Sequence, residues 1–433
     1  MVADCVTVTQ PESGIYEMDY RSVRQTAHMS RSTKKLEEIA DEEYSHRLDG
    51  WSTFRSGIVL RGYEVFVVNF RELTTCADAI REQDNNVTAL WNSLPTLARR
   101  AYLYDLIGEE MKSTNDIEGV RSTRKEIGLA LEAATKHGSH ARFSEFARLF
   151  LALSDDDPAR HSLPETLEDI RGIYDKVVAG ELDAGDEPDG DLFRNGPVYI
   201  DEPATGRRIH TGITPESEIK VALTQWLALT RNRDVPPLIR ASMCHFAFEY
   251  IHPFYDGNGR TGRFLFALQL RQHLSAPTVM SLSPVISEDK DRYYKAFEDA
   301  QHPLNRRDAS LFTYRMMQFI AKAQNRLIDE LSTRRSMLMR SLAELDRLRS
   351  ARDWDDDAAN IVAMLIQEEL FGVASHSITR PWLRESTGLG RDRTNHALDA
   401  LTEDGTLIAT GQRPVRYELS DAIRTAIIGA DRK

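Results

Sequence analysis

The chain has 433 residues, of which 41% are hydrophobic and 28% are charged, and its formal net charge is −12. This composition excludes a disordered chain and a small disulfide-stapled peptide, and it is typical of a globular protein with about two to four domains. The acidic balance repels phosphate backbones, so any contact with nucleic acid must be local.

No apolar run approaches the roughly 20 residues that a membrane span needs, and the first residues lack the basic flank and apolar core of a signal peptide. We therefore expect a cytoplasmic protein without membrane contacts. The three cysteines, Cys5, Cys76 and Cys244, form no CxxC pair. They are predicted to be reduced thiols, which argues against a disulfide framework and a zinc ribbon.

Residues 1–95 form an N-terminal region of mixed pattern. A β-rich patch spans 62–70, and the polar Gln-Asp-Asn-Asn sequence at 83–86 predicts a turn. Helical periodicity begins near Leu97, and Gly119 is predicted to end this helix. We assign 96–325 to a mainly helical core.

Within this core, two short strands around a turn are predicted over 193–212, and helices are predicted over 215–230 and 234–251. One or two long helices cover 308–350, and 326–351 is interpreted as a charged helical connector. A new apolar pattern follows the acidic residues 355–357, so a separate domain is predicted over 352–433.

The densest cluster of chemically active residues is 252–263, with the sequence His-Pro-Phe-Tyr-Asp-Gly-Asn-Gly-Arg-Thr-Gly-Arg. A glycine-rich turn that enters a helix offers free N–H groups and the positive end of the helix dipole, which together bind phosphate. Arg260 and Arg263 can bind successive phosphates, and Asp256 supplies an oxygen ligand of the kind that Mg²⁺ requires. His252 adds a base with an ordinary pKa of about 6.5.

Two other nucleotide motifs share some of these letters. Residues 257–262 satisfy GxGxxG, but the Rossmann turn must follow a strand, and the preceding residues are helical. The glycine spacing also matches a phosphate loop, yet Arg263-Phe264 replaces the Lys and Ser/Thr that such a loop needs. A third interpretation is a tight turn between helices with incidental charges.

Residues 252–263 resemble the complete signature of the Fic family, with no departure at a fixed position. The resemblance implies an enzyme that transfers AMP from ATP, with Mg²⁺, to a Tyr, Thr or Ser hydroxyl of a protein, which can be the enzyme itself. It also implies a mainly α fold, namely a Fic-type helical core with a β-hairpin flap, to which we add a C-terminal winged helix domain.

The same resemblance implies roles for single residues. His252 would be the general base, and Asp256 would hold Mg²⁺. Phe254 would be a buried anchor. The nucleotide-binding residues would be Gly257, Asn258, Gly259, Arg260, Thr261, Gly262 and Arg263.

Two further features are interpreted through the family. The hairpin would be a flap whose residues Val198, Tyr199 and Ile200 align the target by main-chain pairing, although a purely structural hairpin is an alternative. Tyr293 and Tyr294 resemble a position near the nucleoside, and a place in the hydrophobic core is the alternative for both.

Upstream, Thr114 and Glu118-Gly119 resemble the inhibitory motif of a Fic subclass. In that subclass the glutamate pairs with the last arginine of the signature, here Arg263, and occupies the place of the γ-phosphate. The alternative is an ordinary surface glutamate at a helix end.

The predicted C-terminal domain consists of helices over 358–371, 378–385 and 391–402 and strands over 406–409 and 415–419. This order resembles a winged helix-turn-helix, in which Arg391, Arg393 and Asn395 would contact DNA. Dimerisation or docking of a protein substrate is an equal alternative for this domain.

Three functions are compatible with these features. The first is a self-inhibited protein adenylyltransferase. The second is a DNA-binding regulator whose Fic core senses nucleotide, and the third is removal of AMP or transfer of another nucleotide on the same fold. A homodimer is common among similar proteins, but no sequence feature here indicates one.

Overall fold

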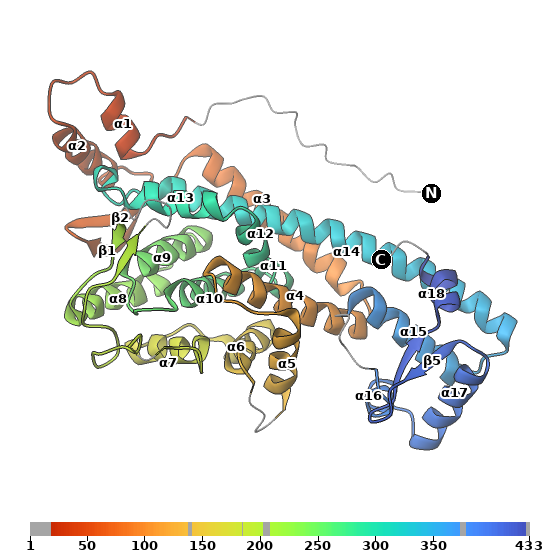
Figure 1. Ribbon diagram of the computed structural model, residues 1–433. Helices are drawn as coiled ribbons and strands as arrows, with labels where there is room; N and C mark the ends of the chain where they lie inside the picture. Colours follow the sequence, from red (N-terminus) through yellow and green to blue (C-terminus); the bar gives the residue numbers. More distant parts are fainter. Residues whose placement is uncertain (1–18, 137–140, 184, 202–207, 373–377, 430–433) are drawn as a thin grey trace, which may run out of the picture.

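The computed structural model describes residues 19–136, 141–183, 185–201, 208–372 and 378–429. It is mainly helical, and the strands in these ranges form three separate two-stranded antiparallel sheets. Figure 1 shows that one very long helix, α14, runs from the centre of the molecule to its C-terminal end. The predicted mainly helical class is confirmed. None of the described helices is both long enough and apolar enough to cross a membrane.

The N-terminal region begins with two helices and a hairpin and ends with a long helix that packs along α14 (Figure 1). The predicted β-rich patch is strand β2 and its flanking residues. The elements of this region are α1 (Val23–Met29), α2 (Leu36–Leu48), β1 (Thr53–Leu60), β2 (Tyr63–Val68) and α3 (Arg71–Asn92).

The turn predicted at 83–86 is wrong, because these residues lie inside α3. Leu73, Ile80 and Val87 are fully buried and recur at a seven-residue spacing that keeps them on one face of the helix. Asp84, which favours turns in isolation, accepts hydrogen bonds from the Ser275 backbone N–H and hydroxyl at 2.9 and 2.7 Å. Tertiary contacts therefore outweigh the local turn preference.

The core is built around two adjacent helices, α9 and α10, whose residues are buried on nearly all sides. Helices α4 to α8 and α11 to α14 surround this pair (Figure 1). The core elements are α4 (Thr96–Ile117), α5 (Arg124–Thr135), α6 (Ser144–Ser154), η1 (Pro158–His161), α7 (Leu167–Val177), β3 (Tyr199–Asp201), β4 (Arg208–Thr211), α8 (Glu216–Arg231), α9 (Pro237–Ile251), α10 (Asn258–Arg271), α11 (Ala276–Val279), α12 (Leu282–Glu288), α13 (Lys290–Gln301), η2 (Pro303–Asn305) and α14 (Ser310–Arg352).

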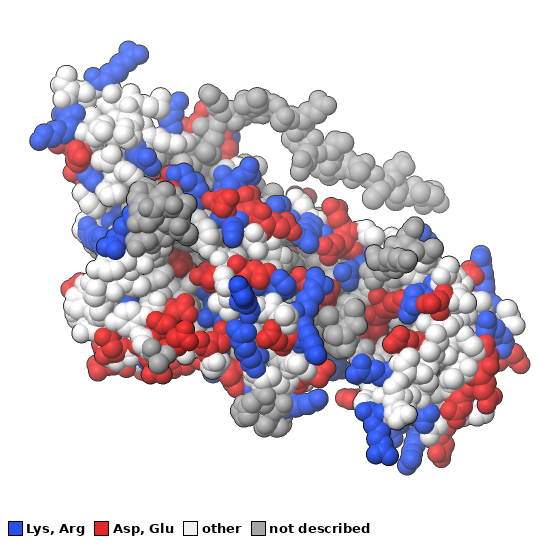
Figure 2. Space-filling view, in the orientation of Figure 1, with Lys and Arg blue, Asp and Glu red and all other residues white. Residues whose placement is uncertain are grey.

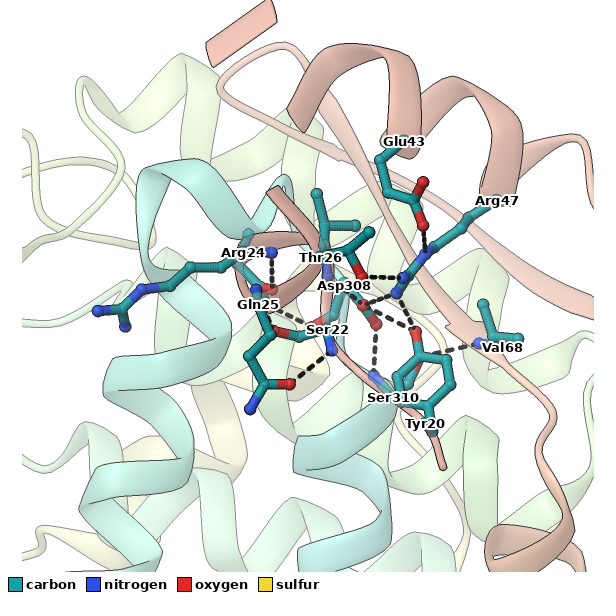
Figure 3. A network of polar contacts seen from close by, with 12 residues as sticks. Tyr20, Ser22, Arg24, Gln25, Thr26, Glu43, Arg47, Val68, Asp308 and Ser310 are labelled. Atoms are coloured by element: carbon teal, nitrogen blue, oxygen red, sulfur yellow. Dashed lines mark hydrogen bonds and ion pairs between the residues drawn. The ribbon is translucent and has the colours of Figure 1, made fainter. Parts of the chain in front are cut away.

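A buried polar network fastens α1 and α2 to the core, as Figure 3 shows. The carboxylate of Asp308 is fully buried, and it accepts hydrogen bonds from the Tyr20 hydroxyl at 2.8 Å and from Arg47 Nη1 at 3.0 Å. It also accepts from the backbone N–H groups of Val23 and Ser310, at 3.2 and 3.0 Å. One carboxylate thus joins the start of α1, the end of α2 and the start of α14.

We call α15 to α18 with β5 and β6 the C-terminal unit. Helix α14 runs unbroken to Arg352, just before this unit, so the residues interpreted as a connector continue a core helix. The first five elements of the unit follow the predicted order, and the last helix, α18, was not predicted. The elements are α15 (Asp356–Phe371), α16 (Arg380–Thr387), α17 (Arg391–Glu403), β5 (Leu407–Thr410), β6 (Arg416–Leu419) and α18 (Asp421–Ile428).

Candidate active site

Helix α9 ends at His252, whose backbone is left-handed with φ of 53°. His252 Nδ1 lies 3.3 Å from the carbonyl oxygen of Glu249. Because a carbonyl can only accept, Nδ1 carries the proton in this contact and Nε2 is the basic nitrogen. Burial lowers the pKa of His252 to about 4. The imidazole is therefore neutral near pH 7 and can accept a proton.

The loop after His252 enters α10 through Gly257, which has φ of +77°. A side chain at this position would be strained and would collide with Val178, so the turn requires glycine. The side chain of Asn258 accepts from the Phe254 N–H at 2.9 Å and donates to the Phe254 carbonyl at 2.8 Å. Asn258 thus braces the loop, and the free amides of the first turn of α10 are left to bind an anion.

The ring of Phe254 anchors the loop in the core. It is fully buried and stacks on Tyr174, with ring centroids 3.5 Å apart. Phe193 packs against its other side at 5.5 Å. This stacking holds the loop between α7 and the segment that precedes the flap.

Arg260 is buried and forms an ion pair with Glu181, with 2.7 Å between Nη1 and Oε2. Its other terminal nitrogen lies 3.8 Å from the carboxylate of Asp256, which is 55% exposed. The guanidinium therefore lies between one buried and one accessible acid, and Asp256 faces the solvent side of the turn.

Arg263 is held by the end of α4. Its Nη1 donates to Glu118 Oε1 at 2.7 Å, and its Nε and Nη2 donate to the hydroxyl and carbonyl oxygens of Thr114 at 2.8 and 3.0 Å. Burial alone would lower the pKa of Arg263, but the Glu118 carboxylate beside it raises that pKa above its ordinary value. A side chain at Gly259 would collide with the same carboxylate. Glu118 thus lies directly against the first turn of α10.

A second carboxyl group lies in this site. The Oε1 atom of Glu249 is buried without a hydrogen-bond partner, and it packs against Gly262. Burial and the nearby charge of Glu118 raise the pKa of Glu249 to about 8. Glu249 is therefore protonated at neutral pH, and its neutral carboxyl group lies in the same site as the ion pair of Glu118 with Arg263.

The two tyrosines of α13 lie differently. Tyr293 is buried, and its hydroxyl lies 2.8 Å from Nε2 of His245, which agrees with the alternative of a place in the core. Tyr294 is 45% exposed and donates to the carbonyl oxygen of Ile117 at 2.9 Å. Tyr294 thus contacts the end of α4 next to Glu118.

The hairpin is present, with Tyr199 and Ile200 in β3 opposite Thr211 and His210 in β4. Val198 precedes β3 and accepts from the Gly212 N–H at 3.1 Å. Tyr199 is 48% exposed. Residues 202–207, which include the tip of the predicted flap, lie outside the described residues.

The base of the hairpin is tied to the His252 loop by Arg194, whose side chain is fully buried. It donates to the carbonyl oxygens of His252 and Ile213 at 2.8 Å and of Gly196 at 2.5 Å. Burial lowers the pKa of Arg194 to about 10. One guanidinium therefore fixes the position of the hairpin relative to the imidazole.

The exposed carboxylate of Asp256 is suited to bind Mg²⁺ together with the phosphates of a nucleotide. Among the described residues, no group of three or more His, Cys, Asp or Glu side chains could hold a metal by itself. Mg²⁺ is commonly held by one or two carboxylates together with substrate phosphates. An exposed Asp256 next to an anion-binding helix end meets this requirement.

Residues 164–270 match the family model described as "Fic/DOC family". This part of the chain is therefore similar to the Fic/DOC family.

The Fic segment has distant relatives among characterised proteins. The protein adenylyltransferase Fic of Nematostella vectensis is 29% identical over 168 residues, which are 38% of this chain and 33% of the relative. That of Culex quinquefasciatus is also 29% identical, over 164 residues, which are 38% of this chain and 28% of the relative. The chain thus spans only about a third or less of the length of these relatives.

Solved structures also resemble this chain. A Fic family protein from Desulfovibrio desulfuricans G20 matches with a TM-score of 0.49 and 19% identity, over 82% of this chain and 97% of that one. Fic-1 of C. elegans, residues 134–508, matches with a TM-score of 0.43 and 18% identity, over 60% of this chain and 74% of that one.

The structure brings together the residues of the Fic signature, Thr114, Glu118 and Tyr294. Arg391, Arg393 and Asn395 lie in α17, far from α10 (Figure 1). Sequence reasoning missed Glu181, Arg194 and Glu249. Only Glu249 had a local signal, since it is the one acid in an apolar helix, three residues before His252.

Proposed function

We propose that this protein transfers AMP from ATP to a hydroxyl group of a protein side chain. One observation carries the proposal. A single turn presents a neutral imidazole, an exposed carboxylate and a free helix N-terminus, with two buried guanidinium groups beside them. A base beside an anion-binding helix end is what nucleotidyl transfer to a hydroxyl needs.

In the proposed reaction, Nε2 of His252 takes the proton of the target hydroxyl as that oxygen attacks the α-phosphorus. A new P–O bond forms, and the bond to the β-phosphate oxygen breaks, so pyrophosphate leaves. The amides of the first turn of α10 and Arg263 bind the phosphates, and Asp256 would hold Mg²⁺. When bound, Mg²⁺ neutralises charge on the phosphates.

Glu118 is proposed to inhibit this reaction. Its carboxylate accepts a hydrogen bond from the guanidinium of Arg263 and lies against Gly259. A phosphate would otherwise approach at this place. A nucleotide that binds while this contact is intact loses Arg263 as a ligand, so its phosphates are held in an unproductive position. The Arg263 side chain is 4% exposed and the Glu118 side chain is 29% exposed, so removing Glu118 leaves a buried charge unpaired, at a cost near the lower end of roughly 3 to 5 kcal/mol.

The test is labelled ATP incubated with the wild-type protein and with Glu118→Gly. At about 1.4 kcal/mol per tenfold change in rate, Glu118→Gly should raise self-adenylylation about a hundredfold. The matched control is Asp116→Gly, which makes the same kind of change at an exposed position of the same helix end, where Asp116 forms an ion pair with Lys112. This control should stay near the wild-type rate.

His252→Ala combined with Glu118→Gly should abolish the label while ATP binding persists. Mass spectrometry of the modified protein then identifies the transferred group. Loss of AMP from a modified protein, or transfer of another nucleotide, would favour the third function named above. Equal labelling of the wild type and Glu118→Gly would refute the inhibitory role.

Binding of DNA by the C-terminal unit is a second candidate function. Figure 2 shows Lys and Arg side chains at the lower end of this unit, and Arg391 is an exposed residue at the start of α17. Arg393, however, is bound to Asp357 by a bidentate ion pair, with 2.7 Å between Nε and Oδ2. A gel-shift assay with random duplex DNA tests this candidate, and Arg391→Ala should weaken any binding and its salt dependence.

A further inference from the structure

Helix α4 connects the candidate active site to the C-terminal unit. Its last turn carries Thr114, and Glu118 follows directly, while its first half contacts α15 (Figure 1). Tyr102 and Glu118 are about 24 Å apart along the helix, at about 1.5 Å per residue. One element therefore touches both regions.

The contact between α4 and the C-terminal unit is buried and aromatic. Phe371, the last residue of α15, is fully buried, and Tyr102 is 1% exposed. Their rings meet edge to face, with centroids 6.1 Å apart. Such aromatic contacts stabilise a packed interface beyond the burial of their apolar area. This contact therefore favours one fixed position of α4 relative to α15.

Arg334 of α14 also contributes to the contact between α4 and α15. Its Nη1 donates to the Leu370 carbonyl at 3.1 Å, and its Nη2 lies 3.5 Å from the carboxylate of Asp105. The guanidinium carbon lies 4.3 Å from the ring centroid of Tyr102. A single side chain thus binds the end of α15 and the first half of α4 together.

The rest of α4 is an unbroken helix held against the core. Midway along it, the buried carboxylate of Glu110 accepts from the Ser283 N–H at 2.8 Å and from the Ser283 hydroxyl at 2.5 Å. Near its end, Ile117 accepts the hydroxyl of Tyr294. A change in the position of the first half of α4 must therefore alter packing along its length or fray its last turn.

We propose that the C-terminal unit controls the strength of the Glu118 contact with Arg263 through α4. With α15 seated on Tyr102, α4 is held in the position that places Glu118 on Arg263. A partner that displaces α15 would loosen α4 and release the site. The effect on activity rests on the proposed function, whereas the effect on α4 itself does not.

Phe371→Ala tests the inference in the full chain. It should raise self-adenylylation about tenfold in the wild-type background and less than twofold in the Glu118→Gly background, where no contact is left to release. The matched control is Trp354→Ala, another aromatic truncation in the same region. Trp354 lies just before the opposite end of α15 and donates to Asp404, so its loss should leave activity within twofold.

Hydrogen exchange gives a readout that does not depend on catalysis. Amides 112–118 should exchange at least fivefold faster in Phe371→Ala and in Arg334→Gln than in the wild type or Trp354→Ala. If Phe371→Ala fails to fold, self-adenylylation and hydrogen exchange are both measured on Arg334→Gln instead. Unchanged exchange in the folded variants, or an equal rise in activity in both backgrounds, would overturn the inference. An inactive Glu118→Gly would instead refute the proposed function, and the exchange data would still decide the coupling.

Discussion

At the scale of single residues, the charge of the candidate site depends on the protonation states of His252 and Glu249. His252 is neutral because burial lowers its pKa, and Glu249 is protonated because burial raises its pKa to about 8. Glu118 forms the ion pair with Arg263. The charge state of the site thus follows from burial rather than from the residue types alone.

The pKa of Glu249 predicts how stability depends on pH. An unfolded glutamate ionises above about 4.3, whereas the folded state keeps the proton up to about pH 8. The unfolded state therefore binds fewer protons in this range, and stability is lost as the pH rises from about 5 to 8. Glu249→Gln mimics the neutral acid and should reduce this loss. Urea unfolding midpoints at pH 5 and pH 8 measure it, and Glu218→Gln, an exposed change on α8, should leave the loss intact.

At the scale of elements, the hairpin and the His252 loop are separate in sequence but act as one body. The Arg194 backbone N–H donates to the Pro253 carbonyl at 3.1 Å, and the Ile213 N–H donates to the Ile251 carbonyl at 3.0 Å. The guanidinium of Arg194 adds bonds to the His252 and Ile213 carbonyls. The position of the hairpin is therefore set by backbone groups of the His252 loop.

Arg194→Lys should loosen this attachment, because one ammonium group cannot reproduce a planar fork that reaches several carbonyl groups. We expect the amides of 208–213 to exchange at least tenfold faster, while the overall unfolding transition shifts by less than for Arg194→Ala. Arg171→Lys is the control, since Arg171 binds Asp175 and the Leu192 carbonyl outside the hairpin. Unchanged exchange in Arg194→Lys would contradict the role given to this side chain.

At the scale of the whole molecule, long-range polar contacts hold the N-terminal helices on the core. The fully buried Asp308 carboxylate forms an ion pair with Arg47 and accepts a hydrogen bond from the Tyr20 hydroxyl (Figure 3). A buried charge that loses its partner costs roughly 3 to 5 kcal/mol. The Asp308 carboxylate, just before α14, is therefore the central polar contact that holds α1 and α2 on the core, beside the ion pair of Asp41 with Arg306.

Asp308→Asn should destabilise the protein by about 3 kcal/mol, because it removes the buried carboxylate that pairs with Arg47 and leaves the weaker, more exposed pair with Glu43. Asp299→Asn removes an exposed carboxylate that pairs with Arg24 and Lys295, and should cost about 0.5 kcal/mol or less. Thermal and urea unfolding compare the two variants. Equal stability of both would show that the buried network does not hold the N-terminal helices.

Helix ends and glycine turns could be predicted from the sequence. The helix stop at His252, the glycine turn and the start of α10 lie within a few residues of one another, so their conformations depend on neighbours in the chain. The same holds for Gly119, which has φ of +73° directly after α4. These features were predictable because backbone sterics and helix capping act over a few residues.

Only the tertiary structure decided which side chains meet. Arg194 gave no signal in the sequence because its partners are backbone carbonyl groups of other segments. The turn predicted at 83–86 became part of α3 because its helix face is buried against distant elements. The neutral state of Glu249 arises from its burial, in contact with Gly262 of α10, and from the nearby charge of Glu118. Burial, pairing and protonation depend on contacts between residues far apart in the chain, and local preference does not report them.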